Sequence, residues 1–474
     1  AHIDPLYEAY GVAECDEPTC CRVVNNSGEL MLDLNIAPTI REMRSLSRNR
    51  YTAPRNPAPA GYWGDYRNCD SPIWAFDDVI ETIAETHKDI DVVYYIGDTI
   101  DHGVWETSYD LINDMNRYIV EKIRKHFGDD VTVIPVIGNH ESQPTNQFAP
   151  FSVTEEFLNT TWLYEALANK WDFYLTEEAK DSLKQRGDFS MSIRPGLRVI
   201  SINNNVSYKY NWWIVYDPLD GKKHLEWLID ELFKAEQAGE KVHILAHIPP
   251  GVHDLTHTWT REYNRIINRF SSTIMAEFNG HTHSDEFKVF YNPEGAPINV
   301  AWGAGSATSY TFYNLNYKIA PENIINYAYN LTEANLTPNR RPHWFQLYDM
   351  KNTYGLSDLS AASVSDLIYR MVTTDKHLLD MYAAFYSKLS DSRWPWCNND
   401  CKLDQLCKTV VTVLWERQKC EELNSLFNPT VLLWVGTMFV RLIQVLLLVS
   451  LCTSSQLITT SDTGFCIKFS FSCS

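Results

Sequence analysis

The sequence predicts a layered α/β domain followed by a small helical subdomain. Through most of the chain, short apolar runs that suit buried strands alternate with helix-like segments. Several of these runs end in a glycine followed by a polar residue, and from about residue 340 the strand signals fade into a helical pattern. Such alternation is typical of sheets that are covered by helices.

The first clear element is a helix over 71–87, in which Ser71 would cap the helix and Pro72 would lie in its first turn. The run "DVVYYIGD" follows and predicts a short buried strand. A second helix over 111–128 should stop at Gly128. The run "VTVIPVIGNHES" then repeats the plan of an apolar strand that ends in a glycine and polar residues.

The same plan continues further along the chain. The runs "LRVISINNN" and "VHILAHIPPG" predict strands on either side of a helix around "HLEWLIDELFKAEQAGEK". The run "STIMAEFNGHTH" completes the series of strands. Residues 363–389 carry a helical pattern, which indicates the helical subdomain.

Polar residues that could bind metal follow these strands directly. Sites of open α/β sheets gather outside the carboxyl ends of strands, so we expect these residues to lie together. His281 and His283 in "GHTH" are two positions apart, so their imidazoles would face one spot if this segment is extended. Mixed nitrogen and oxygen ligands suit zinc, iron or manganese, and a pair of such ions suits in-line displacement at phosphorus. The residues are Asp98, His102, Asn139, His140, His247, His281 and His283.

The order "GD", "GNHE", "H" and "GHTH" resembles the calcineurin-like metallophosphoesterase superfamily. That superfamily begins with a D-x-H motif, and His2 in "AHID" matches its histidine. The aspartate of the motif would be the residue before Ala1, together with the strand that leads into it. The resemblance implies a layered sandwich of two central mixed sheets flanked by helices.

The match narrows to the acid sphingomyelinase family over about residues 1–424. The segments "ECDEPTCCR", "GYWGDYRNCD", "GDTIDHGVW", "GNHES", "HIPPG", "GHTHSDEFKVFY" and "PHWFQLYDMKNTYGL" carry this resemblance, as does a C-x3-C…C-x12-C cluster. It implies a catalytic domain over 1–338 and a disulfide-bonded helical subdomain over 339–424. The hydrophobic tail over 425–474 does not fit the family, whose saposin-like domain would lie upstream.

The resemblance implies two zinc ions and a role for each candidate residue. One zinc would be held by the upstream aspartate, His2, Asp98 and His283, and the other by Asp98, Asn139, His247 and His281. His140 would protonate the departing ceramide oxygen, and His102 would stabilise the phosphoryl transition state. Tyr310 falls where the family has a tyrosine near the choline group. The expected activity is hydrolysis of sphingomyelin, in membranes or lipoproteins, to ceramide and phosphocholine at acid pH.

Cysteines and glycosylation sequons point to a secreted or lysosomal protein. The resemblance implies the disulfides Cys15–Cys20, Cys21–Cys69, Cys397–Cys401 and Cys407–Cys420. The cysteine spacings do not supply the paired knuckles of a zinc ribbon. The sequons begin at Asn25, Asn159, Asn205, Asn330 and Asn335.

The net charge of −19 argues against nucleic acid as a partner, because nothing would neutralise its phosphates. The same charge disfavours a strongly anionic membrane at neutral pH, although much of it would be titrated at acid pH. We expect transient contact with a membrane surface. In the tail, Thr430 to Cys452 is long enough to span a bilayer. A C-terminal anchor and a non-native end therefore both stay open.

Two other functions remain open from the sequence. A related secreted phosphodiesterase acting on nucleotides or other phosphate esters would share the metal motifs and also lack a saposin domain. A protein of another class, which binds lipid or is anchored to the membrane but is impaired in catalysis, would fit a chain that lacks the aspartate of the D-x-H motif and carries the atypical tail.

Overall fold

The computed structural model describes residues 1–22, 59–320 and 322–428. Residues 1–421 form one compact unit and residues 422–474 form a second one. The domain boundaries after residues 338 and 424 stay predictions.

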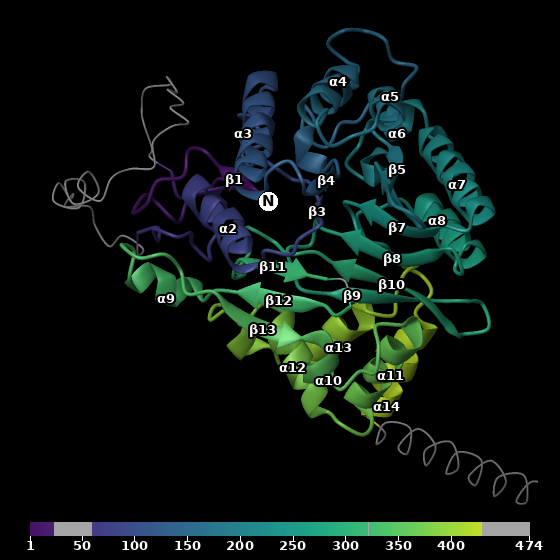
Figure 1. Ribbon diagram of the computed structural model, residues 1–474. Helices are drawn as coiled ribbons and strands as arrows, with labels where there is room; N and C mark the ends of the chain where they lie inside the picture. The colour runs from purple at the N-terminus through teal and green to yellow at the C-terminus, as the bar shows by residue number, and fades with distance from the viewer. Residues whose placement is uncertain (23–58, 321, 429–474) are drawn as a thin grey trace, which may run out of the picture. The chain divides into compact units, whose positions relative to one another are not determined.

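A six-stranded mixed sheet forms one layer of the first unit (Figure 1). Four central strands run parallel and the strand at each edge is antiparallel. The parallel connections pass through α7 (Asp220–Ala238) and α8 (His257–Arg269), which bury apolar faces. The strand order is β5 (Phe189–Arg194), β6 (Leu197–Ile202), β7 (Lys241–Ala246), β8 (Ile274–Asn279), β10 (Pro297–Gly303) and β9 (Phe287–Tyr291).

A second, shorter layer of parallel strands faces this sheet. It consists of β3 (Val92–Tyr95) and β4 (Thr132–Pro135). The hydroxyl of Tyr94 on β3 lies 2.8 Å from Nδ1 of His243 on β7, and the Ser201 hydroxyl on β6 donates to the Pro135 carbonyl. The two sheets therefore pack face to face, as the family resemblance implies.

Helices cover the shorter layer, and a two-stranded parallel pair lies beside it. The pair joins β1 (Ile3–Asp4) to β2 (Ser71–Pro72). The helices are α2 (Ile73–Thr86), α3 (Tyr109–Phe127), α4 (Thr161–Lys170) and α5 (Glu177–Arg186). Short helical turns follow several strands, namely η1 (Asn139–Glu141), η2 (Asn204–Ser207) and α6 (Trp213–Tyr216).

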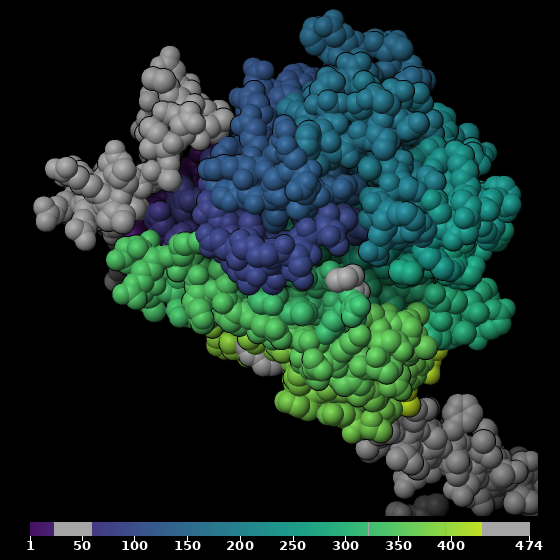
Figure 2. Space-filling model, in the orientation of Figure 1, coloured from purple at the N-terminus to yellow at the C-terminus, as the bar shows by residue number. Residues whose placement is uncertain are grey.

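A three-stranded antiparallel sheet and further helices complete the described chain. Figure 2 shows the green residues of this region lying against the blue-purple α2, where Ala75 and Val79 of the helix share a core with Tyr317 and Tyr329. The strands are β11 (Asn316–Ile319), β12 (Ile325–Ala328) and β13 (Phe345–Asp349). The helices are α9 (Leu331–Leu336), α10 (Met350–Tyr354), α11 (Ala361–Val372), α12 (His377–Tyr386), η3 (Trp394–Trp396), α13 (Asn399–Lys408) and α14 (Gln418–Phe427).

The structure corrects three of the predicted elements. Ser71 does not cap a helix, because it pairs in β2 and the helix begins at Ile73. The helical pattern over 363–389 is divided between α11 and α12. Strands also continue beyond the "GHTH" run, since β9 to β13 follow it. The last three are only four or five residues long and carry several polar side chains, so their apolar pattern is weak.

In the described part of the chain, no helix combines the length and the apolar character needed to cross a bilayer. The predicted span from Thr430 to Cys452 lies outside the described residues.

Candidate metal centre

Two glycines let the loops that carry Asp98 and Asn139 approach each other closely. Gly97 has a φ of 80°, and a Cβ added to it would lie 2.5 Å from the backbone nitrogen of Gly138. A Cβ on Gly138 would lie 2.3 Å from the backbone nitrogen of Asp98. Only glycine avoids both overlaps, which explains the residue before the aspartate and the asparagine in "GD" and "GN".

Glu141 ties the same two loops together. Its buried carboxylate accepts hydrogen bonds from the backbone nitrogens of Asp98, at 3.1 Å, and of Thr99 and Gly138. The motif "GNHE" contains this residue, but sequence reasoning gave it no role. Several backbone donors converging on one carboxylate make it a positioning residue for both loops.

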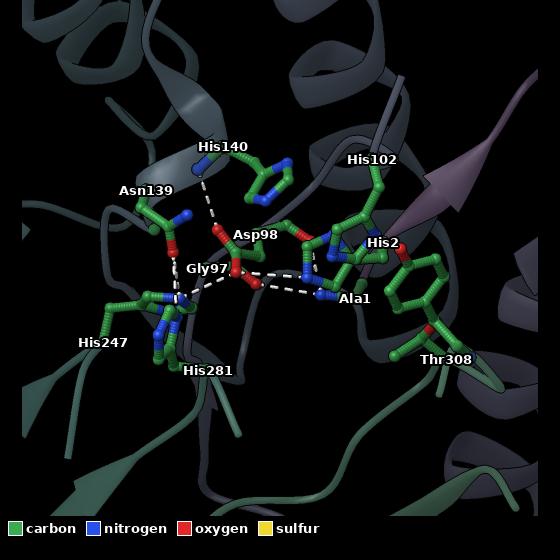
Figure 3. Close-up of polar contacts among 12 residues, drawn as sticks. Ala1, His2, Gly97, Asp98, His102, Asn139, His140, His247, His281 and Thr308 are labelled. Atoms are coloured by element: carbon green, nitrogen blue, oxygen red, sulfur yellow. Dashed lines mark hydrogen bonds and ion pairs between the residues drawn. The ribbon is translucent and has the colours of Figure 1, made fainter. Parts of the chain in front are cut away.

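The first group of candidate ligands, which we call the carboxylate half, comprises Asp98, Asn139, His247 and His281. Oδ2 of Asp98 lies 2.7 Å from Nε2 of His247. Oδ1 of Asn139 lies 3.1 Å from the same His247 nitrogen and 3.0 Å from Nδ1 of His281. These oxygen and nitrogen atoms point toward one another from four separate loops (Figure 3).

Each histidine of the carboxylate half is oriented through its other ring nitrogen. Nδ1 of His247 lies 2.7 Å from the Ile96 carbonyl oxygen, to which it donates. Nε2 of His281 lies 3.1 Å from Oδ2 of Asp254. The nitrogens left to bind a cation are therefore Nε2 of His247 and Nδ1 of His281. No sequence motif pointed to Asp254.

The second group, which we call the histidine half, comprises His2, His102 and His140. Their ring centroids lie 4.2 to 4.7 Å apart, and one nitrogen from each lies within 4.8 Å of the others. His2 contacts the Ile100 carbonyl through Nδ1 at 2.8 Å. His140 contacts the Asp101 carbonyl through Nδ1 at 2.9 Å, so Nε2 is its free nitrogen.

Asp98 joins the two halves. Its Oδ2 atom, which faces His247, also lies 3.2 Å from Nε2 of His2. Its other oxygen, Oδ1, accepts a hydrogen bond from the backbone nitrogen of His140 at 2.9 Å. Figure 3 shows Asp98 between the two groups of side chains. This position suits a carboxylate that bridges two cations.

The two histidines of "GHTH" do not face one spot. His281 and His283 have φ values of 68° and 56°, so the segment is not extended and the expectation from strand geometry is wrong. His281 belongs to the carboxylate half, whereas the ring of His283 lies 4.7 Å from that of His2. The left-handed backbone sends neighbouring imidazoles to opposite halves.

Burial and neighbouring charges set the ionisation of the cluster. Burial would raise the pKa of Asp98, but the imidazoles of His247 and His2 hold this pKa well below its ordinary value. Burial lowers the pKa of His140 well below its ordinary value. A carboxylate that stays ionised among imidazoles is the form that binds a cation.

His102 is held differently from the other two histidines of its half. Nδ1 of His102 lies 2.8 Å from Oδ1 of Asp70, and the ring stacks on Tyr310 with centroids 3.8 Å apart. Burial alone would lower the pKa of His102, but the Asp70 carboxylate raises it above its ordinary value. Asp70 is the last residue of "GYWGDYRNCD", and the sequence pattern alone assigned it no role. Tyr310 therefore lies beside the centre, and its hydroxyl donates to the Pro18 carbonyl.

The donor atoms fit two divalent cations. Asp98, His247 and His281 place ligand atoms within 4.8 Å of one another, as do the members of the histidine half. The carboxylate half combines imidazole nitrogens with carboxylate and amide oxygens, and its Asp98 also faces His2 of the histidine half. The structure thus brings together all seven predicted strand-end residues and His2.

The four expected disulfides are present in the described residues. They join Cys15 to Cys20, Cys21 to Cys69, Cys397 to Cys401 and Cys407 to Cys420. Cys69 of the Cys21–Cys69 disulfide directly precedes Asp70, whose carboxylate contacts His102.

One predicted glycosylation site is wrong. The Asn205 side chain is fully buried and donates hydrogen bonds to the Ile137 carbonyl and to Oδ1 of Asn203, so no glycan fits there. Asn25 lies outside the described residues. Asn159, Asn330 and Asn335 are partly exposed and stay predictions.

Comparison with known proteins assigns the family. The calcineurin-like phosphoesterase model matches residues 68–285, and the model of the acid sphingomyelin phosphodiesterase C-terminal region matches residues 299–420. Sphingomyelin phosphodiesterase 1 of Caenorhabditis elegans is 33% identical over 417 residues, which cover 86% of this chain and 68% of the worm protein. The chain belongs to the acid sphingomyelinase family.

Mammalian members of the family are equally similar. The sphingomyelin phosphodiesterases of Bos taurus and Homo sapiens are each 35% identical over 83% of this chain. The matched region spans 60% of the bovine protein and 59% of the human one.

Proposed function

We propose that this chain hydrolyses sphingomyelin to ceramide and phosphocholine at acid pH, with two zinc ions at the metal centre. One observation carries the proposal. Asp98 faces both His247 and His2, directly beside the His102–His140 pair, in a chain of the acid sphingomyelinase family. Zinc accepts imidazole and carboxylate ligands together, which suits these residues.

The geometry supports one assignment of the ligands. Asp98, Asn139, His247 and His281 would hold one ion, and His2, His283 and the shared Asp98 would contribute to the other. Bound there, two divalent cations would act as Lewis acids on the phosphoryl group and lower the pKa of the attacking water.

His140 would act as the general acid. Its Nδ1–H donates to the Asp101 carbonyl, which fixes the tautomer and leaves Nε2 to exchange a proton with substrate. Attack by water at phosphorus breaks the bond to the ceramide oxygen, and a proton from His140 neutralises the alkoxide as it leaves. Burial lowers the pKa of His140, so the protonated imidazole that this step requires would depend on both acid pH and the negative charge of a bound phosphodiester.

His102 would stabilise the phosphoryl group. The Asp70 carboxylate beside it favours the charged imidazolium, which attracts the negative phosphodiester. Tyr310 stacks on the same ring, which supports a contact between Tyr310 and the head group of the substrate. The choline contact of Tyr310 belongs to this proposal.

The setting of the enzyme is part of the same proposal. Disulfides in the described residues and the family relationship support a secreted or lysosomal location. A lipid substrate also requires transient contact with a membrane surface.

The test compares substrates. The purified full chain is assayed at pH 5 on sphingomyelin and on a nucleoside triphosphate, with bound metals counted by elemental analysis. We expect two zinc ions per chain and a clear preference for sphingomyelin. Preference for the nucleotide would refute the substrate assignment, and fewer than two metals per chain would refute the dinuclear centre.

A further inference from the structure

A ladder of aromatic rings leads from the carboxylate half to the protein surface. The ring of Tyr208 lies edge-on to that of His281, with centroids 5.6 Å apart. The ring of Tyr210 lies 5.3 Å beyond that of Tyr208. Tyr208 is buried, whereas Tyr210 is exposed, so the ladder starts at a candidate ligand and ends in solvent.

Beyond Tyr210 the chain forms an apolar tip, which we define as Trp212, Val215, Tyr216 and Leu219. These side chains are 76%, 89%, 66% and 63% exposed, respectively. The short helix α6, which supplies two of them, buries none of its own residues against the described chain. Contiguous exposed apolar side chains mark interaction surfaces more often than chance.

The tip stands on a firmly held base. The backbone nitrogen of Lys209 donates to the Asp254 carbonyl at 2.7 Å. The Gln147 side chain donates to the Tyr210 carbonyl at 2.8 Å and accepts from the Trp212 nitrogen at 3.1 Å. These bonds fix the backbone on both sides of Tyr210, so the exposed rings are presented by an ordered segment.

The surroundings of the tip are electrically neutral, although the chain as a whole carries a net charge of −19. Residues 208–226 contain three lysines and three carboxylates. Lys223 pairs with Asp217 at 2.8 Å, and Lys222 pairs with Glu226 at 3.3 Å. Such a surface suits a partner without net charge and gives no attraction to a polyanion.

We propose that the apolar tip docks onto a zwitterionic phospholipid bilayer and holds the carboxylate half at the membrane surface. The inference rests on the proposed function, because a lipid substrate is what brings a bilayer to this site. Tryptophan and tyrosine suit the boundary of a membrane, since their rings are apolar and their N–H and O–H groups remain hydrated.

A second copy of the chain is a poorer occupant. A stable protein interface buries about 800 Å² on each partner and engages roughly 20–30 residues a side. The tip offers four side chains, whereas a few exposed rings and aliphatic groups suffice for shallow insertion among lipid head groups.

The test measures partition into vesicles of phosphatidylcholine without sphingomyelin, by flotation at pH 5. Replacing Trp212, Val215 and Leu219 together by serine should lower the partition coefficient of the full chain by at least about tenfold, because three apolar groups leave the lipid. The matched control is Leu336→Ser, which removes a 77% exposed leucine on α9, far from α6 in Figure 1. It should change partition by less than about twofold.

Salt and self-association provide the opposing outcomes. Because the surface is neutral, raising the salt from about 0.1 M to about 1 M should not release the protein. Release by salt, absence of binding to neutral vesicles, or equal binding by the triple variant would each overturn the proposal. So would a dimer in solution that the triple variant converts to monomers.

A second variant keeps the test valid if the triple variant misfolds. Trp212→Phe preserves the apolar surface, so it should bind vesicles as the parent chain does. Brominated lipids should quench the fluorescence of the parent more than that of Trp212→Phe, since only the parent places this indole in the bilayer. Equal quenching would contradict the placement of Trp212.

Docking and catalysis can fail separately. A chain that binds vesicles but does not cleave sphingomyelin would refute the proposed function and leave docking intact. The triple variant should hydrolyse a water-soluble nitrophenyl phosphodiester at the parent rate, because the tip supplies no group to the reaction. A loss on that soluble substrate equal to the loss on vesicles would refute a pure docking role.

Discussion

The two halves of the metal centre share Asp98 but are built differently. In the carboxylate half, each histidine points one ring nitrogen toward the centre and the other toward an oxygen of the protein, from Ile96 or Asp254. Three kinds of donor converge there: carboxylate, amide and imidazole. These donors suit a cation, and we propose that the carboxylate half binds one.

The histidine half is richer in imidazoles and borders the aromatic ring of Tyr310. It contains His102, whose pKa is raised, next to His140, whose pKa is lowered. Two neighbouring groups pushed apart in pKa are a common mark of acid–base chemistry. The comparison teaches that one half is suited to grip an ion and the other to meet the substrate.

The strongest way to break this comparison is to remove the proposed acid. We expect His140→Ala to keep both metals and to lower turnover on sphingomyelin by about 10²–10⁴-fold, the loss typical of a general acid. A nitrophenyl phosphodiester should lose far less, because nitrophenolate leaves without a proton. Metal analysis and the two rate measurements check this.

The control for that experiment is His343→Ala, which removes an exposed histidine. It should leave both rates unchanged. Equal losses on the two substrates in His140→Ala would reject the acid role. Loss of a metal would show that His140 is a metal ligand instead.

The next effect concerns a buried carboxyl group beneath the carboxylate half. Glu277 lies on β8, the strand that leads to His281, and burial raises its pKa to about 7 despite a hydrogen bond from the Asn279 amide. The Tyr263 side chain also faces this carboxyl group. The proton is therefore held more tightly in the folded state than in the unfolded state.

The sign of the pH dependence follows. The stability that this group contributes is fully present below the ordinary pKa of 4.5 and is lost as pH rises through about 7. The loss amounts to about 3 kcal/mol in the free energy of unfolding. Denaturant unfolding measured below pH 4.5 and again above pH 7 should show this fall in the parent and a smaller fall in Glu277→Gln. Glu226→Gln, at an exposed position, should behave as the parent does, and an equal fall in all three chains would disprove the prediction.

The smallest expected effect sharpens the comparison through Asp254, which contacts His281 of the carboxylate half. Asp254 accepts from Nε2 of His281 and has a pKa of about 2, although burial opposes this, so it is ionised at pH 5. Asp254→Asn should weaken metal affinity by about 10–100-fold, as expected when a carboxylate no longer orients a ligating histidine. Competition with a chelator measures this affinity.

The matched control is Asp217→Asn, which removes another carboxylate paired with a lysine but far from the ligands in sequence. Its metal affinity should equal that of the parent. If Asp254→Asn instead lowered turnover at full metal occupancy, the division of labour between the halves would be wrong.

Much of this centre could be predicted because its residues follow short apolar strands in recognisable motifs. Asp98, Asn139 and His247 gather because the carboxyl ends of stacked strands meet. The separation of His281 from His283 was not predictable from strand periodicity, since it depends on left-handed backbone angles. The burial of Asn205 was hidden as well, because a sequon does not reveal the hydrogen bonds its side chain makes in the fold.

Residues that position the ligands were the hardest to foresee. Asp254 reaches His281 across 27 positions of sequence, and Asp70 reaches His102 across 32. Their spacing carries no period of a helix or strand, so only the folded chain reveals them. The later strands were missed for a related reason: their polar side chains are buried by tertiary packing, which local patterns do not record.

The disulfide between Cys21 and Cys69 has a consequence for where the enzyme can mature. Two residues adjoin its cysteines. Asp70 contacts His102 directly, and Arg22 pairs with Asp101, whose carbonyl contacts His140. In a reducing cytosol this disulfide would not form, whereas the carboxylate half around His281 could still assemble. The disulfide forms only in an oxidising compartment, so the proposed activity would depend on the redox potential there. A host that cannot oxidise thiols should yield protein that binds metal but does not turn over substrate.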